Sequence, residues 1–188
     1  MGLTKNSHKS TLLQDATGLK SNHRDITVAL AGNPNVGKST VFNALTGMHQ
    51  HTGNWSGKTV STAKGSYIYL GRKIILIDIP GTYSLNANSA EEEVARDFIL
   101  DGKANVTVVV CDAATLQRNI ALLLQINQTN NKTILCINFI DEAKKRGITV
   151  NTEKMSKMLG LPVVAVSGKK KLGLNTLSDE IIKMHALI

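Results

Sequence analysis

Short apolar runs alternate with amphipathic stretches along the chain from residue 25 onwards. Four of these runs are rich in Val, Ile and Leu and have the length expected of buried strands; they lie at residues 26–31, 106–111, 133–138 and 162–166. Two more runs, at residues 67–70 and 73–79, flank the dipeptide Gly71-Arg72 and predict a β-hairpin.

The stretches between these runs predict helices. Residues 40–45 are followed by Gly47, which is typical of a helix end. Ser89 and Glu92 stand at capping-box spacing and predict the start of a helix that runs toward Leu100. Two further segments, residues 116–128 and 174–187, carry apolar residues at helical spacing. Strands that alternate with helices predict an α/β domain with a mostly parallel sheet, one antiparallel strand and helices on both faces.

The length of 188 residues suits one domain. No apolar run approaches the roughly 20 residues that span a bilayer, and the polar N-terminus lacks the apolar segment of a secretory signal. Cys111 and Cys136 stand in apolar runs and are expected to be buried, reduced thiols. We expect residues 1–24 to be a flexible or loosely docked extension of a single domain over residues 25–188.

The formal charge of +8 raises the question of an anionic partner. Part of the excess lies in the N-terminal tail and in residues 169–171, and the rest is scattered without the interleaved aromatic residues that stack on bases. We therefore expect a solvated basic surface, with proximity to an anionic membrane face as the second interpretation.

A sequence that fits the phosphate-binding P-loop, G-x-x-x-x-G-K-[ST], follows the run at residues 26–31. Its members are Gly32, Asn33, Pro34, Asn35, Val36, Gly37, Lys38 and Ser39. Backbone N–H groups of such a loop point toward phosphates, and the N-terminus of the following helix, near Thr40, favours the same negative charge. Lys38 can then reach the terminal phosphates and Ser39 can ligate Mg²⁺. The chain is predicted to bind a nucleoside triphosphate.

A second phosphate motif closes the run at residues 73–79. It consists of Asp78, Ile79, Pro80 and Gly81. An aspartate there can hold a Mg²⁺-bound water, and the Gly81 N–H can contact the γ-phosphate. Residues 15–18 also fit D-x-x-G, but only Asp78 stands at the end of an apolar run.

A base-recognition motif follows the run at residues 133–138. It consists of Asn138, Phe139, Ile140 and Asp141. The Asp141 carboxylate can accept both the N1–H and the N2 amine hydrogens of guanine, which adenine cannot supply. Residues 22–25 also fit N-x-x-D but lie in the expected tail. Ser167, Gly168 and Lys169 follow the last strand, where GTPases close the guanine pocket with backbone N–H groups. Together these motifs predict a P-loop GTPase with a Ras-like G domain.

Residues 51–60 lie between the P-loop helix and the hairpin, where GTPases carry their first switch. Thr59 is expected to complete the Mg²⁺ shell when a γ-phosphate is present. Its neighbours are expected to line the nucleotide; they are Gly57, Lys58 and Val60. An ordinary exposed loop is the alternative. Trp55, the only tryptophan, either senses the switch or anchors the loop to the core.

Four strings closely resemble the family of ferrous-iron transport protein B, FeoB. They are GNPNVGKS at residues 32–39, HTGNW at 51–55, DIPGTYSL at 78–85 and DEAKKRG at 141–147. The resemblance extends from Asp25 to the C-terminus. Two positions depart from it: Ser56 stands where the family usually has Pro, and Val36 stands where many members have Ser.

The resemblance implies an excised GTPase domain from a bacterial inner-membrane Fe²⁺ transporter. Such a domain lies on the cytoplasmic face of the cell membrane, and its GTP hydrolysis drives or gates Fe²⁺ uptake. The implied partners are GTP, GDP and the membrane-spanning part of the parent transporter, with no nucleic acid, and an oligomer is left open.

Thr82 stands where Ras-like proteins carry the glutamine that orients the attacking water. Threonine is too short for that geometry, so intrinsic turnover is expected to be slow. In the family that the chain resembles, K⁺ stabilises the developing charge, which implies K⁺ beside Mg²⁺ here. The implied K⁺ ligands are Asn35 and the carbonyl oxygens of Gly53 and Trp55, and the implied catalytic residues are Asn35, Lys38 and Thr59.

Two other functions remain open on sequence grounds. A ribosome- or RNA-assembly GTPase would suit the net positive charge and Val36. No RNA-binding module is visible in the sequence, however, and the loop at residues 53–55 does not fit that class of GTPase. A nucleotide-binding sensor with negligible turnover would suit Thr82. Direct binding of iron is a further alternative for His49 and His51, but we expect both to be ordinary solvated histidines near a loop.

Overall fold

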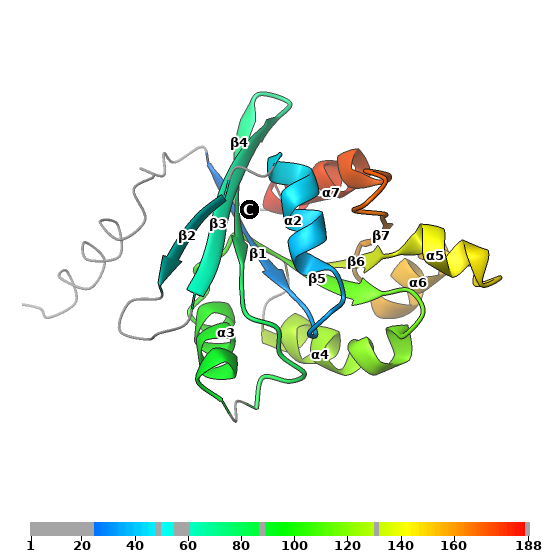
Figure 1. Cartoon of the computed structure of the whole chain (residues 1–188), viewed down its shortest axis with the longest axis horizontal. Helices are drawn as coiled ribbons and strands as arrows, with labels where there is room; N and C mark the ends of the chain where they lie inside the picture. Colours follow the sequence, from blue (N-terminus) through cyan, green and yellow to red (C-terminus); the bar gives the residue numbers. More distant parts are fainter. Residues whose placement is uncertain (1–24, 48–49, 55–60, 87–88, 130–131, 187–188) are drawn as a thin grey trace, which may run out of the picture.

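The computed structural model describes residues 25–47, 50–54, 61–86, 89–129 and 132–186 (Figure 1). Across these residues one seven-stranded sheet has the order β2-β3-β4-β1-β5-β6-β7. The strands are β1 (Ile26–Ala31), β2 (Gln50–Asn54), β3 (Ser61–Tyr69), β4 (Arg72–Asp78), β5 (Val106–Asp112), β6 (Thr133–Asn138) and β7 (Val163–Ala165). Because β3 is antiparallel to both β2 and β4 while the other pairs are parallel, β3 is the one reversed strand. The predicted α/β fold with one antiparallel strand is confirmed.

Helices cover both faces of the sheet (Figure 1). They are α2 (Lys38–Thr46), α3 (Ala90–Leu100), α4 (Leu116–Thr129), α5 (Ile140–Lys145), α6 (Thr152–Leu159) and α7 (Leu174–Ala186). One apolar core joins α2 and α7 to alternate residues of β1, β5 and β6, such as Leu30. A second core joins α3 and α4 to the other alternate residues of the same three strands, such as Ala29. This division explains why the central strands are apolar throughout rather than alternating.

The hydrophobic pattern predicts the long elements well. The strands at 26–31 and 133–138 and the starts of α3, α4 and α7 lie where the sequence places them. Ser89 caps α3 as predicted, because its Oγ accepts a hydrogen bond of 3.2 Å from the Glu92 N–H. The hairpin turn lies one residue earlier than predicted, at Leu70-Gly71.

Three elements are not predicted by the pattern. β2 is short and mostly polar, and it forms by pairing with β3. α5 has six residues, and α6 has eight residues with no fully buried side chain; only Met155 and Leu159 pack, partly buried, against the second core. The predicted N-terminal extension, residues 1–24, lies outside the described residues. Within the described part of the chain, every helix is too short or too polar to cross a bilayer.

Candidate nucleotide site

The P-loop joins the end of β1 to the start of α2. Its backbone is left-handed at Asn35, with φ of 66°, and at Gly37, with φ of 83°. A side chain on Gly37 would collide with the Asn138 amide and the Phe139 ring, so a close approach of two loops requires glycine there. The loop then turns into α2, where Val41 N–H donates to the Gly37 carbonyl oxygen at 3.0 Å.

Lys38, Ser39 and Asp78 come together at the ends of β1 and β4. Ser39 Oγ donates a hydrogen bond of 3.0 Å to Asp78 Oδ2. Burial lowers the pKa of Lys38, and the negative charge of Asp78 opposes that change. Burial likewise raises the pKa of Asp78, opposed by Lys38 and by the Ser39 hydroxyl. The site therefore holds a cation and a carboxylate that each lack full solvation.

The segment after Asp78 lies against the P-loop. Thr82 N–H donates to the Gly32 carbonyl oxygen at 3.2 Å, and a Cβ added to Gly81 would lie 3.1 Å from Pro34 N. Ile79 is buried and Pro80 half-buried beside them. Thr82 itself is 1% exposed, and its hydroxyl donates to the Ser84 carbonyl oxygen at 2.6 Å. The hydroxyl is thus engaged with Ser84 and, at 3.3 Å, with Glu92 Oε1 on α3.

Asn138 connects the P-loop with the loop after β7. Its side-chain amide donates to the Val36 carbonyl oxygen at 3.2 Å, and its Oδ1 accepts from the Gly168 N–H at 3.1 Å. Gly168 also packs against Thr40, which a Cβ on Gly168 would approach to 3.2 Å. The Gly168 N–H, which the sequence suggests for the guanine pocket, is therefore engaged with Asn138.

Asp141 lies in the first turn of α5, next to the loop after β7. The hydrogen bond from the Ser167 hydroxyl, together with backbone N–H groups and the Lys170 charge, lowers the pKa of the Asp141 carboxyl. Lys170 Nζ lies 3.7 Å from Asp141 Oδ2. A cavity of about 540 Å³ borders this carboxylate, and Ile140, Lys170 and Leu172 help to line it. An ionised acceptor at the edge of a cavity fits recognition of a base with two adjacent donors.

Most predicted site residues are described, and the structure brings the three motifs to one edge of the sheet. Trp55 and the residues 57–60, including Thr59, lie outside the described residues. Gly53 lies in β2, opposite Thr62 of β3. Lys169 is exposed, and its neighbour Lys170 is the lysine that pairs with Asp141. The sequence pattern does not separate the two, since both belong to one basic run.

Contacts between the segment after Asp78 and α4 are not predicted from sequence. The Arg118 guanidinium lies 5.1 Å from the centre of the Tyr83 ring. Leu85 N–H donates to Gln125 Oε1 at 2.8 Å. Arg118 and Gln125 are seven residues apart on α4, a spacing that would place both on one helix face, but the sequence alone does not name their partners.

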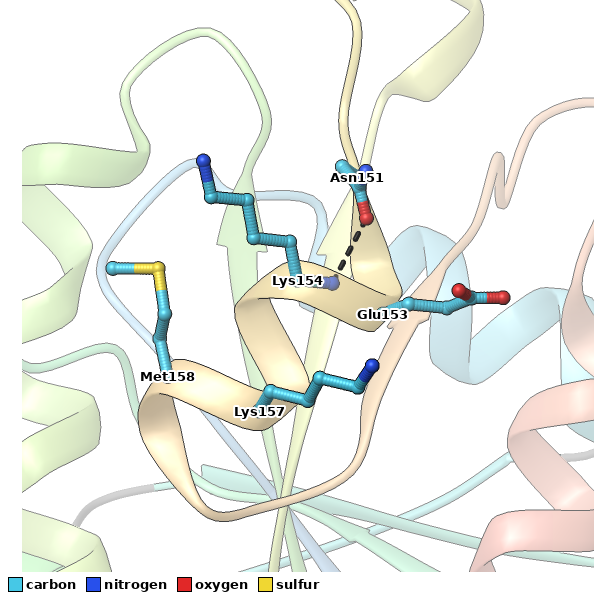
Figure 2. A pocket seen from close by; sticks show the side chains of 5 residues that line it. All are labelled: Asn151, Glu153, Lys154, Lys157 and Met158. Atoms are coloured by element: carbon cyan, nitrogen blue, oxygen red, sulfur yellow. Dashed lines mark hydrogen bonds between the residues drawn. The ribbon is translucent and has the colours of Figure 1, made fainter.

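A second cavity, of about 380 Å³, lies on the surface of α6 (Figure 2). Asn151 caps this helix by accepting a hydrogen bond of 2.8 Å from the Lys154 N–H. The side chains of Lys154, Lys157 and Met158 extend outward from the helix (Figure 2). None of its lining residues belongs to the three motifs. Across the described residues, no three His, Cys, Asp or Glu side chains gather as a metal site.

A family model described as ferrous iron transport protein B matches residues 26–181. The Fe(2+) transporter FeoB of Helicobacter pylori strain J99 is 43% identical over 166 residues, which cover 87% of this chain and 26% of that protein. The chain thus spans about a quarter of the length of that curated relative.

Solved structures agree with this match. The G domain of the T. maritima FeoB iron transporter superposes with a TM-score of 0.81 at 43% identity, covering 85% of this chain and 98% of that one. The cytosolic domain of the same transporter in its GMPPNP form gives a TM-score of 0.82 at 44% identity, covering 84% of this chain and 63% of that one.

Proposed function

The chain belongs to the family of ferrous iron transport protein B, and we propose that it binds GTP and hydrolyses it to GDP and phosphate. It does so as the cytosolic G domain of a bacterial Fe²⁺ transporter, at the cytoplasmic face of the cell membrane. Coupling or gating of Fe²⁺ uptake through the membrane-spanning part of the parent protein belongs to the same proposal. The family match favours this function over an RNA-assembly GTPase.

The observation that carries the proposal is the grouping of Lys38, Ser39 and Asp78 beside the P-loop. The Ser39–Asp78 hydrogen bond of 3.0 Å joins two side chains whose oxygen atoms can ligate a hard metal ion. Asp78 Oδ1 is buried without a hydrogen-bond partner. This donor set fits Mg²⁺, which prefers oxygen ligands and keeps several waters. Ser39 would bind the ion directly, Asp78 through a water, and Thr59 once a triphosphate is present. The ion would neutralise charge on the β- and γ-phosphates.

Hydrolysis in this site depends on charge stabilisation rather than on a glutamine. Thr82 is buried and hydrogen-bonded to Ser84, which supports the view that it does not orient water. Lys38 supplies a fixed positive charge at the phosphates. K⁺ held by Asn35 and by the carbonyl oxygens of Gly53 and Trp55 would supply a second one. The exposed position of Asn35 in the loop supports this assignment.

Turnover of GTP and ATP with Mg²⁺ tests the proposal. We expect GTP hydrolysis and no comparable ATP hydrolysis. Lys38→Met should lower GTP turnover by about a hundredfold or more, because the charge at the phosphates is lost. Lys157→Met, at an exposed lysine on α6, is the matched control and should leave the rate nearly unchanged. Tight GTP binding without turnover would identify a sensor instead, and equal use of ATP would contradict guanine recognition.

A further inference from the structure

The turn between β3 and β4 exposes two large aliphatic side chains. Ile68 is 76% exposed and Leu70 is 75% exposed. They lie at the end of the β3–β4 hairpin, which extends beyond α2 and α7 at the top of Figure 1. The alternate residues Tyr67 and Tyr69 pack against the core under α7. Ile68 therefore points to the other side of the hairpin.

The backbone at this turn makes the exposed leucine more unusual. Leu70 has φ of 48° and Gly71 has φ of 71°, so both turn residues are left-handed. Turns of this kind favour Asn, Asp or Gly, and a bulky residue at positive φ is sterically disfavoured. An exposed leucine in this conformation gains little from burial to offset its steric cost. Such a residue points to a role outside the fold.

Basic residues lie on both sides of the hairpin near its end. Lys73 stands opposite Ile68 in the strand register, and Lys64 lies four residues before Ile68 on β3. Burial lowers the pKa of Lys64, and the positive charge of Lys73 lowers it further. Lys73 Nζ also lies 3.9 Å from Asp25 Oδ2. Arg72 is exposed directly after the turn and stands opposite Tyr69, on the α7 side. The apolar tip is therefore bordered by positive charge.

We propose that this hairpin tip, formed by Ile68, Leu70, Arg72 and Lys73, docks on an anionic lipid bilayer. The two aliphatic side chains insert between headgroups, and the basic residues contact lipid phosphates. A protruding apolar tip suits insertion, whereas a groove would suit a peptide. The net charge of +8 complements an anionic leaflet as well.

The nucleotide site remains accessible in this orientation. The turn lies at the start of β4 and Asp78 lies at its end. A strand of this length separates the two by about 20 Å. The proposal is independent of the assigned nucleotide chemistry, because no residue of the hairpin tip belongs to the nucleotide motifs.

Flotation of the 188-residue chain with lipid vesicles tests the proposal. We expect binding to vesicles that contain phosphatidylglycerol, and little binding to pure phosphatidylcholine. The double variant Ile68→Ser with Leu70→Asn should lower binding by about tenfold. Leu70→Asn suits the turn, so thermal unfolding should show an intact fold. Met158→Ser, at an equally exposed residue on α6, is the matched control.

Charge is tested separately. Arg72→Gln should lower binding to anionic vesicles by about fivefold, while Lys157→Gln on α6 should have less effect. The proposal is overturned if the unmodified chain does not bind, or if the double variant binds as well as the unmodified chain. It is also overturned if Met158→Ser loses binding equally, since the basic chain would then adhere without a defined surface. A dimer that the double variant abolishes, without lipid binding, would assign the tip to a second copy.

Discussion

The side-chain amide of Asn138 donates a hydrogen bond of 3.2 Å to the carbonyl oxygen of Val36, 102 residues away in sequence. The same side chain accepts from Gly168 N–H, so a single buried residue holds the phosphate loop, the base motif and the loop after β7 in register. Base and phosphate recognition therefore depend on a shared anchor.

Loss of this anchor should affect both folding and binding. Asn138→Ala removes three hydrogen bonds of a fully buried side chain, to the Val36 and Gly37 carbonyl oxygens and from the Gly168 N–H, and leaves these backbone groups without that partner. We expect a loss of about 2–4 kcal/mol in the free energy of unfolding, measured in urea, and weaker GDP binding. Asn175→Ala, at an exposed position on α7, is the control. Unchanged stability in Asn138→Ala would show that these bonds do not hold the loops.

The acid limit of GDP binding should depend on Ser167. The Ser167 hydroxyl is the largest contributor to the lowered pKa of Asp141. Above the ordinary aspartate pKa of about 3.9 the carboxylate is ionised and its contribution to folding stability is fully present. Because the pKa is lowered in the folded state, the negative charge and this contribution are lost only as the pH falls through the lowered pKa. In Ser167→Ala the pKa of Asp141 rises, so GDP affinity should begin to fall at a higher pH.

GDP affinity measured from neutral pH downward checks this order. Lys170→Met should shift the acid limit in the same direction but less, because the Lys170 charge contributes less than the hydroxyl. Ser156→Ala on α6 is the control, because the Ser156 hydroxyl donates to the Leu161 carbonyl oxygen, away from the nucleotide motifs. Identical pH profiles in Ser167→Ala and the unmodified chain would contradict the account.

GTP turnover should be faster in K⁺ than in Na⁺. A cation beside Asn35 would offset charge that grows between the β- and γ-phosphates, so it should act on turnover more than on affinity. Such a contribution can reach about a thousandfold. Asn35→Ala should abolish the difference between the salts and leave GDP binding nearly intact. Choline chloride at equal ionic strength is the reference, and equal rates in K⁺ and Na⁺ would exclude the mechanism.

The sequence predicts the elements whose burial pattern is complete. β1 and β6 are apolar on both faces, so their ends, and hence the motifs that follow them, can be placed from the chain alone. α6 buries no residue fully, and its local signals are short: the caps Asn151 and Gly160, and the pair Met155 and Leu159 at helical spacing. β2 has no apolar pattern and depends on its partner β3.

The site residues also divide into those that the local sequence pattern places and those that it does not. Asp78 and Asp141 can be placed because each stands at or just beyond the end of an apolar run. Lys170 cannot be distinguished from Lys169 by spacing. Its approach to Asp141 depends on the closed loop in which Ser167 bridges to Leu172 and Lys171 adopts φ of 54°. Contacts of this kind depend on tertiary geometry, which a local pattern does not encode.

The central claim is guanine recognition by Asp141, and competition binding with GTP, ATP and xanthosine triphosphate tests it most directly. For the unmodified chain we expect GTP to compete strongly and ATP not to compete. Asp141→Asn should weaken GTP by about a hundredfold and improve xanthosine triphosphate, whose base presents an acceptor where guanine presents an amine. Glu142→Gln, at the exposed neighbouring carboxylate, should retain the original preference. Unchanged GTP affinity in Asp141→Asn, or equal competition by ATP in the unmodified chain, would contradict the account.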